Sequence, residues 1–425
     1  MDKPLTQNIL SGRDYTTFQE YTETGGYQGL RAVINGYTPE QVQQQIKESG
    51  LRGRGGAGFP TGMKWSFVPM GEQSPKQKYF VANADEMEPG SFKDRLLMEK
   101  DPHQLIEGII ISAYAIEASI AYIFLRGEYV EATKRLQVAL AESYKNNLLG
   151  QNILDSKYNL EIYLHTSAGR YICGEETALL NSLEGKRATP RSKPPFPQIS
   201  GLWGLPTIVN NVETVCNVPH ILRNGVDWYK SLGLGENDGT KIYGVSGRVK
   251  NPGAWELPLG TSAREIIENK AGGMLDDYQL KGFLPGGAST DFLLPEHLDI
   301  AMDYETVAQA GSRLGTGTII ILDNKTDVVA MVLNLERFFA QESCGWCTPC
   351  RDGLPWTVKL LEDLLAGNGK PEDLGRLSKL TRLLGPGNTF CALAPGAMEP
   401  LQSALKYFRA DFEHYLDNEQ IVELS

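Results

Sequence analysis

The stretch 119-SIAYIFLRGEYVEATKRLQVALAESYKN-146 decides the fold, because an apolar strand runs directly into an amphipathic helix. The same order precedes it in 78-KYFVANA-84 and 101-DPHQLIEGIIISAYAI-116. It follows again in 158-YNLEIYLHT-166 and 174-GEETALLNSLEG-185. Three strand–helix units in a row are typical of a parallel sheet covered by helices on both faces. The sequence therefore predicts an α/β protein with a Rossmann-like, three-layer parallel domain.

Polar residues gather where two of these predicted strands end, in 83-NADEMEPGS-91 and 167-SAGRYICGEETAL-179. Ligands of parallel sheets bind at the carboxyl ends of the strands, so both segments are candidate binding loops. Helix capping is the structural alternative, and for Glu175 and Glu176 a position at a helix start is explanation enough. The proline- and glycine-rich residues 186–214 are expected to form an ordered loop over the site.

A glycine-rich loop, 53-GRGGAGFPTGMKW-65, precedes the first strand unit. It contains the spacing G-x-G-x-x-G but follows a predicted helix, which argues against the usual dinucleotide fingerprint. It is not a P-loop either, because Met63 stands where that motif needs its lysine. Glycines at this density suit a backbone that approaches a flat or phosphorylated ligand closely, and a flexible surface loop is the alternative. The interleaved side chains of Phe59, Lys64, Trp65 and Phe67 favour the ligand, because flexible linkers rarely carry so much aromatic and apolar surface.

The second half of the chain changes style. Short predicted strands at 241–247, 254–259, 278–284 and 317–322 suit a small ubiquitin-like β-grasp domain. From residue 328 onward the pattern is helical, at 329–343, 354–367, 371–385 and 396–418, which predicts a four-helix bundle. The expected domains are 1–238, 239–327 and 328–425.

Three cysteines in 342-ESCGWCTPCR-351 are followed by a fourth in 388-NTFCAL-393. One end of a helical bundle can bring Cys344, Cys347, Cys350 and Cys391 together, and four thiolates suffice for a [4Fe–4S] cluster. Zinc is the alternative, although structural zinc sites usually use two separated C-x-x-C pairs. Six cysteines in 425 residues are too sparse for a disulfide-stapled domain.

The bulk composition excludes some classes of protein. A formal net charge of −11 without a long basic run argues against a nucleic-acid partner. The apolar stretch 109–125 is interrupted by Glu117 and is expected to divide into a helix end, a turn and a buried strand rather than to span a membrane. The first residues lack the apolar core of a signal peptide, so we expect a cytoplasmic protein.

Several of these motifs together resemble one family, the NADH-binding flavoprotein subunit of respiratory complex I (NADH:quinone oxidoreductase). The matching segments are 52-RGRGGAGFPTGMKW-65, 83-NADEMEPGSFKDR-95, 171-YICGEETALLNSLEG-185, 206-PTIVNNVET-214 and 342-ESCGWCTPCR-351, with Cys391. The resemblance covers nearly the whole chain. It implies one FMN, one NADH site and one [4Fe–4S] cluster.

The resemblance also implies roles for individual residues. The loop from Gly53 to Gly62 lines the flavin and nucleotide cavity, with Lys64 near the flavin ring. Three phenylalanines stack on adenine, Glu88 and Tyr171 flank the nicotinamide, and the adjacent glutamates face the ribose. By the resemblance Glu176 is the better candidate for the ribose contact and Glu175 lies nearer the flavin and nicotinamide, although the sequence alone does not settle which. The expected cofactor-binding residues are Gly53, Arg54, Gly55, Gly56, Ala57, Gly58, Phe59, Lys64, Phe67, Asn83, Asp85, Glu86, Glu88, Tyr171, Gly174, Glu175, Glu176, Phe196, Asn210, Asn211 and Thr214, and the expected cluster ligands are Cys344, Cys347, Cys350 and Cys391.

The implied reaction is hydride transfer from NADH to FMN, followed by single-electron transfer to the cluster and on toward quinone. No side chain is expected to act as an acid–base catalyst. The implied partners are a thioredoxin-like [2Fe–2S] subunit and a larger iron–sulfur subunit of the peripheral arm, on the cytoplasmic side of the inner membrane. Two alternatives remain: the diaphorase subunit of an NAD-reducing hydrogenase or formate dehydrogenase, and a zinc-stabilised nucleotide-binding scaffold.

Overall fold

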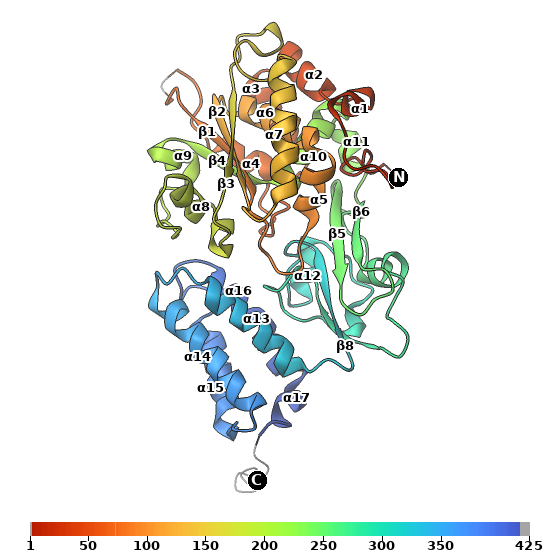
Figure 1. The fold of residues 1–425 in the computed structure, drawn as a ribbon, viewed down its shortest axis with the longest axis vertical. Coiled ribbons are helices and arrows are strands. Elements are labelled where there is room, and N and C mark those ends of the chain that lie inside the picture. The colour runs from red at the N-terminus through yellow and green to blue at the C-terminus, as the bar shows by residue number, and fades with distance from the viewer. Residues whose placement is uncertain (1, 73, 417–425) are drawn as a thin grey trace. The chain divides into compact units, whose positions relative to one another are not determined.

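The computed structural model describes residues 2–72 and 74–416, which belong to two compact units (Figure 1). The first unit comprises Met1–Met87, Ser91–Tyr243 and Ala254–Thr261. The second comprises Glu88–Gly90, Gly244–Gly253 and Ser262–Ser425. Each unit is described by itself below.

The first unit is built on a four-stranded, fully parallel sheet with the order β3-β2-β1-β4. Its strands are β1 (Tyr79–Ala84), β2 (Ile120–Leu125), β3 (Glu161–Thr166) and β4 (Thr207–Asn211). The predicted α/β fold with a parallel sheet is therefore confirmed. The expectation of a loop throughout 186–214 is wrong, because β4 lies within it. This strand is only five residues long, which is too short for a clear sequence pattern, and it is defined by its pairing with β1.

Helices cover the two faces of this sheet. In Figure 1, α6 (Pro102–Ala115), α7 (Val130–Lys145) and α10 (Val212–Asn224) lie on one side, and α8 (Glu176–Leu183) and α9 (Pro197–Ser200) on the other. The remaining helices of this unit are α1 (Phe18–Glu23), α2 (Gln28–Gly36), α3 (Pro39–Glu48), α4 (Thr61–Ser66), α5 (Lys93–Lys100) and α11 (Val226–Lys230), with 3₁₀ turns η1 (Ile153–Asp155), η2 (Tyr171–Gly174) and η3 (Leu202–Gly204).

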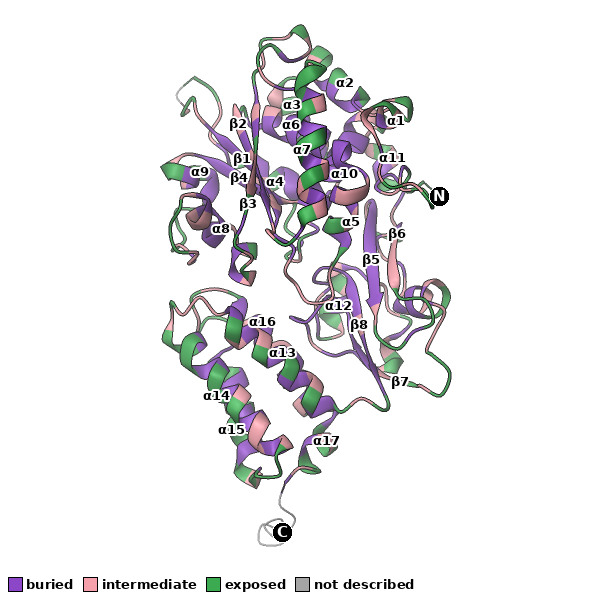
Figure 2. Cartoon of the chain, viewed as in Figure 1, coloured by how far each residue is buried: buried purple, intermediate pink, exposed green. Residues whose placement is uncertain are grey.

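The apolar stretch 109–125 divides as predicted. Helix α6 is buried along nearly its whole length (Figure 2), and the chain turns at Glu117, whose φ is 58°, before β2 begins. Within the described ranges, no helix is both long enough and apolar enough to cross a membrane.

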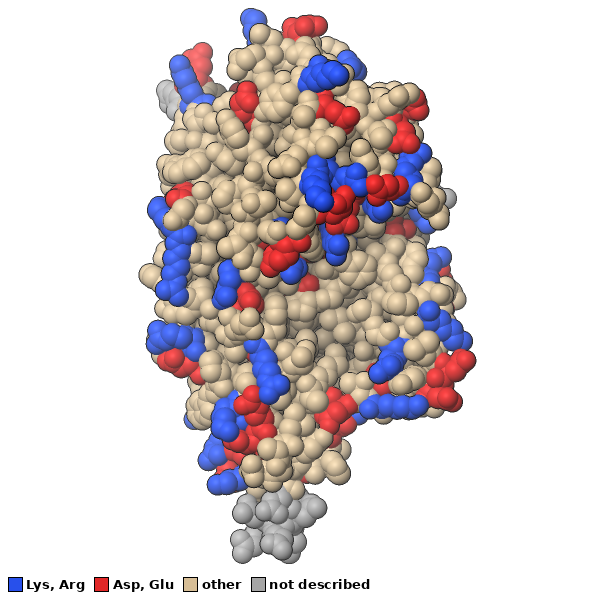
Figure 3. All heavy atoms as spheres, viewed as in Figure 1, with Lys and Arg blue, Asp and Glu red and all other residues tan. Residues whose placement is uncertain are grey.

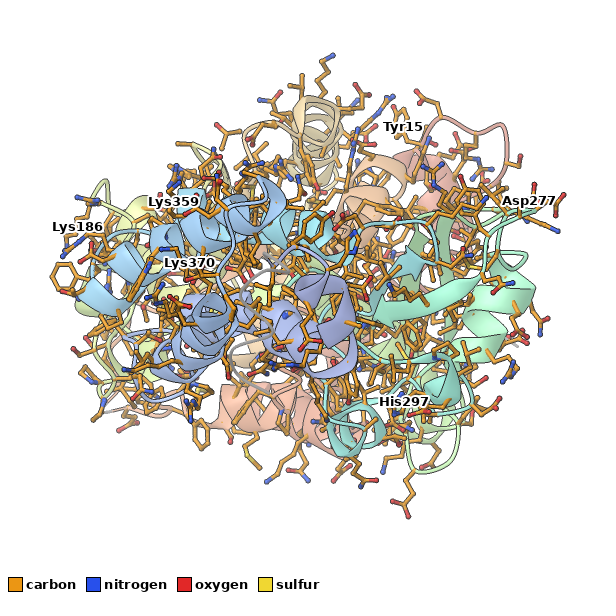
Figure 4. The ribbon with its side chains drawn as sticks, turned by 90° about the horizontal axis from the view of Figure 1, so that it is seen from below. Tyr15, Lys186, Asp277, His297, Lys359 and Lys370 are labelled. Carbon is orange, nitrogen blue, oxygen red and sulfur yellow. The ribbon has the colours of Figure 1, made fainter. Side chains whose placement is uncertain are left out.

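A second sheet has the order β6-β5-β8-β7. Its strands are β5 (Thr240–Ser246), β6 (Gly253–Pro258), β7 (Leu280–Leu284) and β8 (Thr318–Asp323), accompanied by η4 (Glu265–Lys270), η5 (Pro295–His297) and α12 (Tyr304–Gln309). Strand β8 pairs parallel with β5 from Gly244 onward and antiparallel with β7. Asp277, with a φ of 68°, lies on an outer loop that precedes β7 (Figure 4). The mixed sheet agrees with the predicted strands, and the boundaries 239–327 stay a prediction.

The chain then becomes helical, with α13 (Val328–Glu342), α14 (Thr348–Leu365), α15 (Pro371–Leu383), α16 (Leu393–Tyr407) and α17 (Arg409–Glu413). Helix α14 begins earlier than the predicted residue 354, because a proline in the first turn costs no hydrogen bond. Its polar side faces outward, where Lys359, labelled in Figure 4, pairs with Asp363 one turn further on. The predicted helix 396–418 is instead divided at Phe408, and its predicted last residues, 417 and 418, lie outside the described residues.

Candidate functional site

The site begins where β1 and β4 end side by side. Asn83 and Asn211 are register partners at the carboxyl ends of these parallel strands. The chain runs from β1 through β2 to β3 on one side and returns to β4 on the other, so the order of strands reverses between β1 and β4. Such a reversal opens a crevice that receives ligands in doubly wound sheets. Two of the three asparagines predicted as ligand contacts are thus brought together.

The glycine loop contacts the end of β4 and the first turn of α10. The backbone N–H of Arg54 donates to Thr214 Oγ1 at 2.8 Å, in the first turn of α10. A Cβ on Gly55 would lie 3.0 Å from the Cβ of Asn211, so the absence of a side chain allows this close approach. Gly56 has a φ of 126°, a conformation that other residues rarely adopt. The loop is therefore shaped by packing and is not a floppy linker.

The guanidinium of Arg54 points away from the loop. It is fully buried, and Nη2 donates to the hydroxyl of Tyr229 at 3.2 Å and to the carbonyl of Thr240 at 3.0 Å. Its side chain therefore anchors the loop inside the first unit. Direct contact of Arg54 with a cofactor stays a prediction.

A partly buried ion pair joins the loop region to α8. Lys64 Nζ lies 2.6 Å from Glu176 Oε2 and 2.8 Å from the carbonyl oxygen of Val209 on β4. Lys193 adds contacts to Glu176 at 3.2 Å and to Glu175 at 3.0 Å. Burial alone would raise the pKa of Glu176, but the two lysines outweigh it and lower the pKa. Glu176 is therefore an anion at neutral pH.

The neighbouring Glu175 has a different role. Its side chain caps α8 by accepting the backbone N–H groups of Thr177 and Ala178, both at 2.9 Å. This confirms that a helix-capping explanation fits Glu175. Glu176 faces Lys64 instead, so the two glutamates have different surroundings.

The three phenylalanines predicted to stack on adenine have exposed rings. Phe59 and Phe67 are 46% and 51% exposed, and their ring centroids lie 6.5 Å apart. Phe196, at the start of α9, is 52% exposed. Rings in such positions can stack on a planar ligand. Trp65, which the sequence placed among the aromatic residues of this loop, is instead fully buried and donates from Nε1 to Asn210 Oδ1 at 2.8 Å.

The carboxylates after β1 take separate positions. Asp85 Oδ1 accepts from the hydroxyl of Ser167, which follows β3, at 2.9 Å. Glu86 accepts the backbone N–H groups of Asp94 and Arg95 at the start of α5, so its carboxylate caps that helix. Burial, and then the charge of Asp94, raises the pKa of Glu86. Direct contact of Glu86 with a cofactor stays a prediction.

The other predicted contacts divide between the two units. Tyr171 and Gly174 form η2 in the first unit, where the side-chain amide of Asn83 donates to the carbonyl of Gly174 at 3.2 Å. Glu88 belongs to the second unit, and Oε1 accepts the backbone N–H of Ser289 at 2.7 Å. Its role beside a nicotinamide stays a prediction.

The residues of the first unit fit a flavin nucleotide. Close-approach glycines, polar strand ends, a lysine and exposed rings supply the contacts that a planar, phosphorylated ligand requires. The hydroxyl of Thr61, at the end of the glycine loop, is buried and lacks a hydrogen-bond partner among the described residues. An available donor of this kind suits a loop that contacts a ligand.

The cysteine segments occupy one end of the helices in the second unit. Cys347 is the N-cap of α14, Cys350 lies in its first turn, and Cys391 lies just before α16. No cysteine of the described residues forms a disulfide. Ser343 Oγ lies 3.1 Å from Cys350 Sγ, and burial is the largest cause that raises the pKa of Cys350 to about 11.

The two cysteine segments meet through aromatic rings. Trp346, beside Cys347, contacts Phe390, beside Cys391, with ring centroids 6.3 Å apart. A set of four thiols is chemically suited to an iron–sulfur cluster. In the part of the chain that the structure describes, no three His, Cys, Asp or Glu side chains converge closely enough to hold a metal ion. The individual cluster ligands therefore stay a prediction.

Comparison with known families gives three matches. Residues 46–220 match the Nuo51 FMN-binding domain, residues 242–292 match the SLBB domain, and residues 330–415 match the NADH-ubiquinone oxidoreductase-F iron-sulfur binding region. The third range contains all four cysteines selected from the sequence.

Similar proteins match over almost the whole chain. The F subunit of the NADH-quinone oxidoreductase of Escherichia coli (strain K12) is 58% identical over 410 residues, covering 96% of this chain and 92% of that protein. The F 2 subunit of the corresponding enzyme of Rhizobium meliloti (strain 1021) is 50% identical, covering 98% of each chain. Among solved structures, an NAD⁺-reducing [NiFe]-hydrogenase in the H₂-reduced state matches with a TM-score of 0.84 at 34% identity, covering 95% of this chain and 67% of that one.

Proposed function

This chain belongs to the family of NADH-quinone oxidoreductase F subunits, and we propose on this premise that it oxidises NADH at the β1/β4 crevice and passes the electrons on one at a time. FMN and a [4Fe–4S] cluster are its cofactors, and NADH is its substrate. The observation that carries the proposal is that the glycine loop packs against Asn211 at the end of β4, and Asn211 is the register partner of Asn83 at the end of β1.

When bound, FMN supplies the step that converts a two-electron hydride donor into a source of single electrons. The chain's own residues bind FMN and NADH and orient them. The glycine loop brings its backbone N–H groups to the cofactor, and Lys64, fixed by Glu176 and Val209, presents a positive charge beside it. Phe59, Phe67 and Phe196 would stack on the adenine of NADH.

Glu176 is our candidate for the adenosine ribose contact. It is ionised and lies in the first turn of α8, whereas the neighbouring Glu175 is occupied with capping that helix. A carboxylate accepts hydrogen bonds from ribose hydroxyls and repels a 2′-phosphate, which favours NADH over NADPH.

We propose Cys344, Cys347, Cys350 and Cys391 as the cluster ligands. The adjacent rings of Trp346 and Phe390 would shield one side of the cluster from water. We therefore propose three functional segments. Residues 1–238 bind the nucleotides, residues 239–327 form a β-grasp domain, and residues 328–425 carry the cluster.

The chain works together with other subunits of its complex, as its family membership implies. We propose a thioredoxin-like [2Fe–2S] subunit and a larger iron–sulfur subunit of the peripheral arm as the direct partners. The proposed location is the cytoplasmic side of the inner membrane, reached through the assembled complex.

The diaphorase of an NAD-reducing hydrogenase is the second candidate, because such a hydrogenase shares the fold at a TM-score of 0.84. The 58% identity to an NADH-quinone oxidoreductase subunit exceeds the 34% identity to the hydrogenase chain. Quinone-linked NADH oxidation is therefore the preferred function.

Purified full-length chain, loaded with FMN and reconstituted with iron and sulfide, tests the proposal. It should reduce ferricyanide with NADH and release flavin on denaturation, while showing no inhibitor-sensitive quinone reduction without its partners. A colourless protein that binds zinc and no flavin would contradict the redox function. Inhibitor-sensitive quinone reduction by the isolated chain would contradict the assigned partners.

A further inference from the structure

Four charged side chains are buried together, and two of them contact Asn211 at the end of β4. Lys93 Nζ lies 2.7 Å from Asp94 Oδ1 and 2.9 Å from Glu213 Oε2, and Lys241 Nζ lies 3.4 Å from the same Glu213 oxygen. Each of the four side chains is at most 4% exposed. On the face drawn in Figure 3, in contrast, acidic and basic side chains are interspersed at the surface. We call these four residues the buried quartet.

The quartet holds both ends of one side-chain amide at the crevice. Asn211 Nδ2 donates to Asp94 Oδ2 at 2.6 Å, and Asn211 Oδ1 accepts from Lys93 Nζ at 3.3 Å. The same Oδ1 accepts the backbone N–H of Thr214 at 3.4 Å as the N-cap of α10. The rotamer of Asn211 is therefore fixed by one charged group on each side.

Asp94 also occupies the start of α10. Its Oδ1 accepts the backbone N–H of Glu213 at 3.2 Å. A helix N-terminus directly after a strand of a doubly wound sheet is a position that favours an anion. Here the chain's own carboxylate takes that position, and the first turn of α10 is stabilised without any ligand.

The charges in the quartet depend on one another. Burial alone would lower the pKa of Lys93. The negative charges of Asp94, Glu213 and Glu86 have the opposite and larger effect, so the pKa of Lys93 is raised. Burial alone would raise the pKa of Glu213, and Lys241 followed by Lys93 lower it. Removing one partner from such a buried set leaves an uncompensated charge, which is strongly unfavourable.

We propose that the buried quartet is a positioning device, in which Asp94 and Lys93 hold Asn211 and the first turn of α10 ready for the flavin nucleotide before it binds. The inference rests on the proposed function, because it takes the β1/β4 crevice as the flavin site. None of the four side chains needs to touch the cofactor. Their effect is a lower entropic and reorganisation cost of binding, since the contact surface is already in place.

The test compares FMN affinity with thermal stability in full-length apo-protein. Asp94→Asn keeps the side-chain shape and removes the charge, and it should raise the FMN Kd, measured by fluorescence quenching, about tenfold through the loss of charge-assisted bonds. The double variant Lys93→Met/Asp94→Asn restores neutrality. It should recover Tm relative to the single variant, while its FMN Kd stays raised because Asn211 has lost both charged partners.

Lys78 provides the matched control. It is a buried lysine at the amino end of β1, paired with Glu117 at 2.7 Å. Lys78→Met should lower Tm and leave the FMN Kd unchanged. If affinity falls in proportion to Tm in all these variants, or recovers with Tm in the double variant, the quartet only stabilises the fold and the inference is wrong.

Different results would contradict the proposed function and the positioning role of the buried quartet. Wild-type apo-protein that does not bind FMN contradicts the proposed function itself. Wild-type protein that binds FMN, together with an Asp94→Asn variant of equal affinity, contradicts only the positioning role.

Discussion

The indole ring of Trp346 lies edge-on against the ring of Phe390, with their centroids 6.3 Å apart and their planes inclined at 69°. The contact joins two connections between helices, one before α14 and one before α16. Cys347 and Cys391 are the immediate neighbours of these rings in the sequence. Aromatic packing therefore joins the segment that contains Cys391 to the segment that contains Cys347.

Replacing Cys347 with Ala should abolish the electron paramagnetic signal of the reduced [4Fe–4S] cluster, because water is a poor substitute for a thiolate ligand. FMN should remain bound. Cys216→Ala is the control, since Cys216 is fully buried within α10 and lies outside the cysteine motif. An unchanged signal in the Cys347 variant would show that the ligand set is wrong.

Glu176→Gln should shift the ratio of kcat/KM for the two nucleotides toward NADPH. The substitution removes a charge that repels the 2′-phosphate and a charge-assisted bond to the ribose, each worth about 1.5–3 kcal/mol. Glu175→Gln is the comparison, and it should mainly weaken the cap of α8. Ferricyanide reduction with each nucleotide measures the ratio. Should only the Glu175 variant shift it, the two roles are reversed.

Phe67→Ala should raise the KM for NADH severalfold with little change in kcat, because stacking on adenine contributes to binding and not to hydride transfer. Val138→Ala is the control, since Val138 is 45% exposed on α7. Initial rates over a range of NADH concentrations give both constants. A fall in kcat without a change in KM would place the ring elsewhere in the reaction.

Glu336→Met should stabilise the protein. The carboxyl of Glu336 is buried in α13, and neither oxygen has a hydrogen-bond partner among the described residues. Burial raises its pKa well above 4.5, so the folded chain holds a proton that the unfolded chain releases above that pH. The free energy of unfolding therefore falls as pH rises above 4.5.

The variant lacks this dependence and should gain about 1–3 kcal/mol at pH 8, with a smaller gain near pH 5. Denaturant unfolding at both pH values measures the difference. An equal gain at both values would mean that the carboxyl of Glu336 does not titrate in this range.

Much of the fold was predictable from local pattern. Each unit of an apolar strand followed by an amphipathic helix carries its own periodicity, and the cysteine spacing is visible without a structure. The short strand β4 escaped prediction, because its five residues follow a proline-rich segment and gain their partner only in the folded sheet. The crevice depends on that strand, so its position could not be read from periodicity.

The roles of long side chains were decided only by the tertiary structure. The backbone of Arg54 binds Thr214, 160 residues further along the chain, while its guanidinium turns into the interior. Lys93 and Asp94 look like surface residues in the sequence, yet both are buried beside Asn211. Sequence spacing sets which residue types are available and where local elements begin. Burial and charge pairing arise from segments that meet only on folding, so they determine which of those residues face a ligand and which support it.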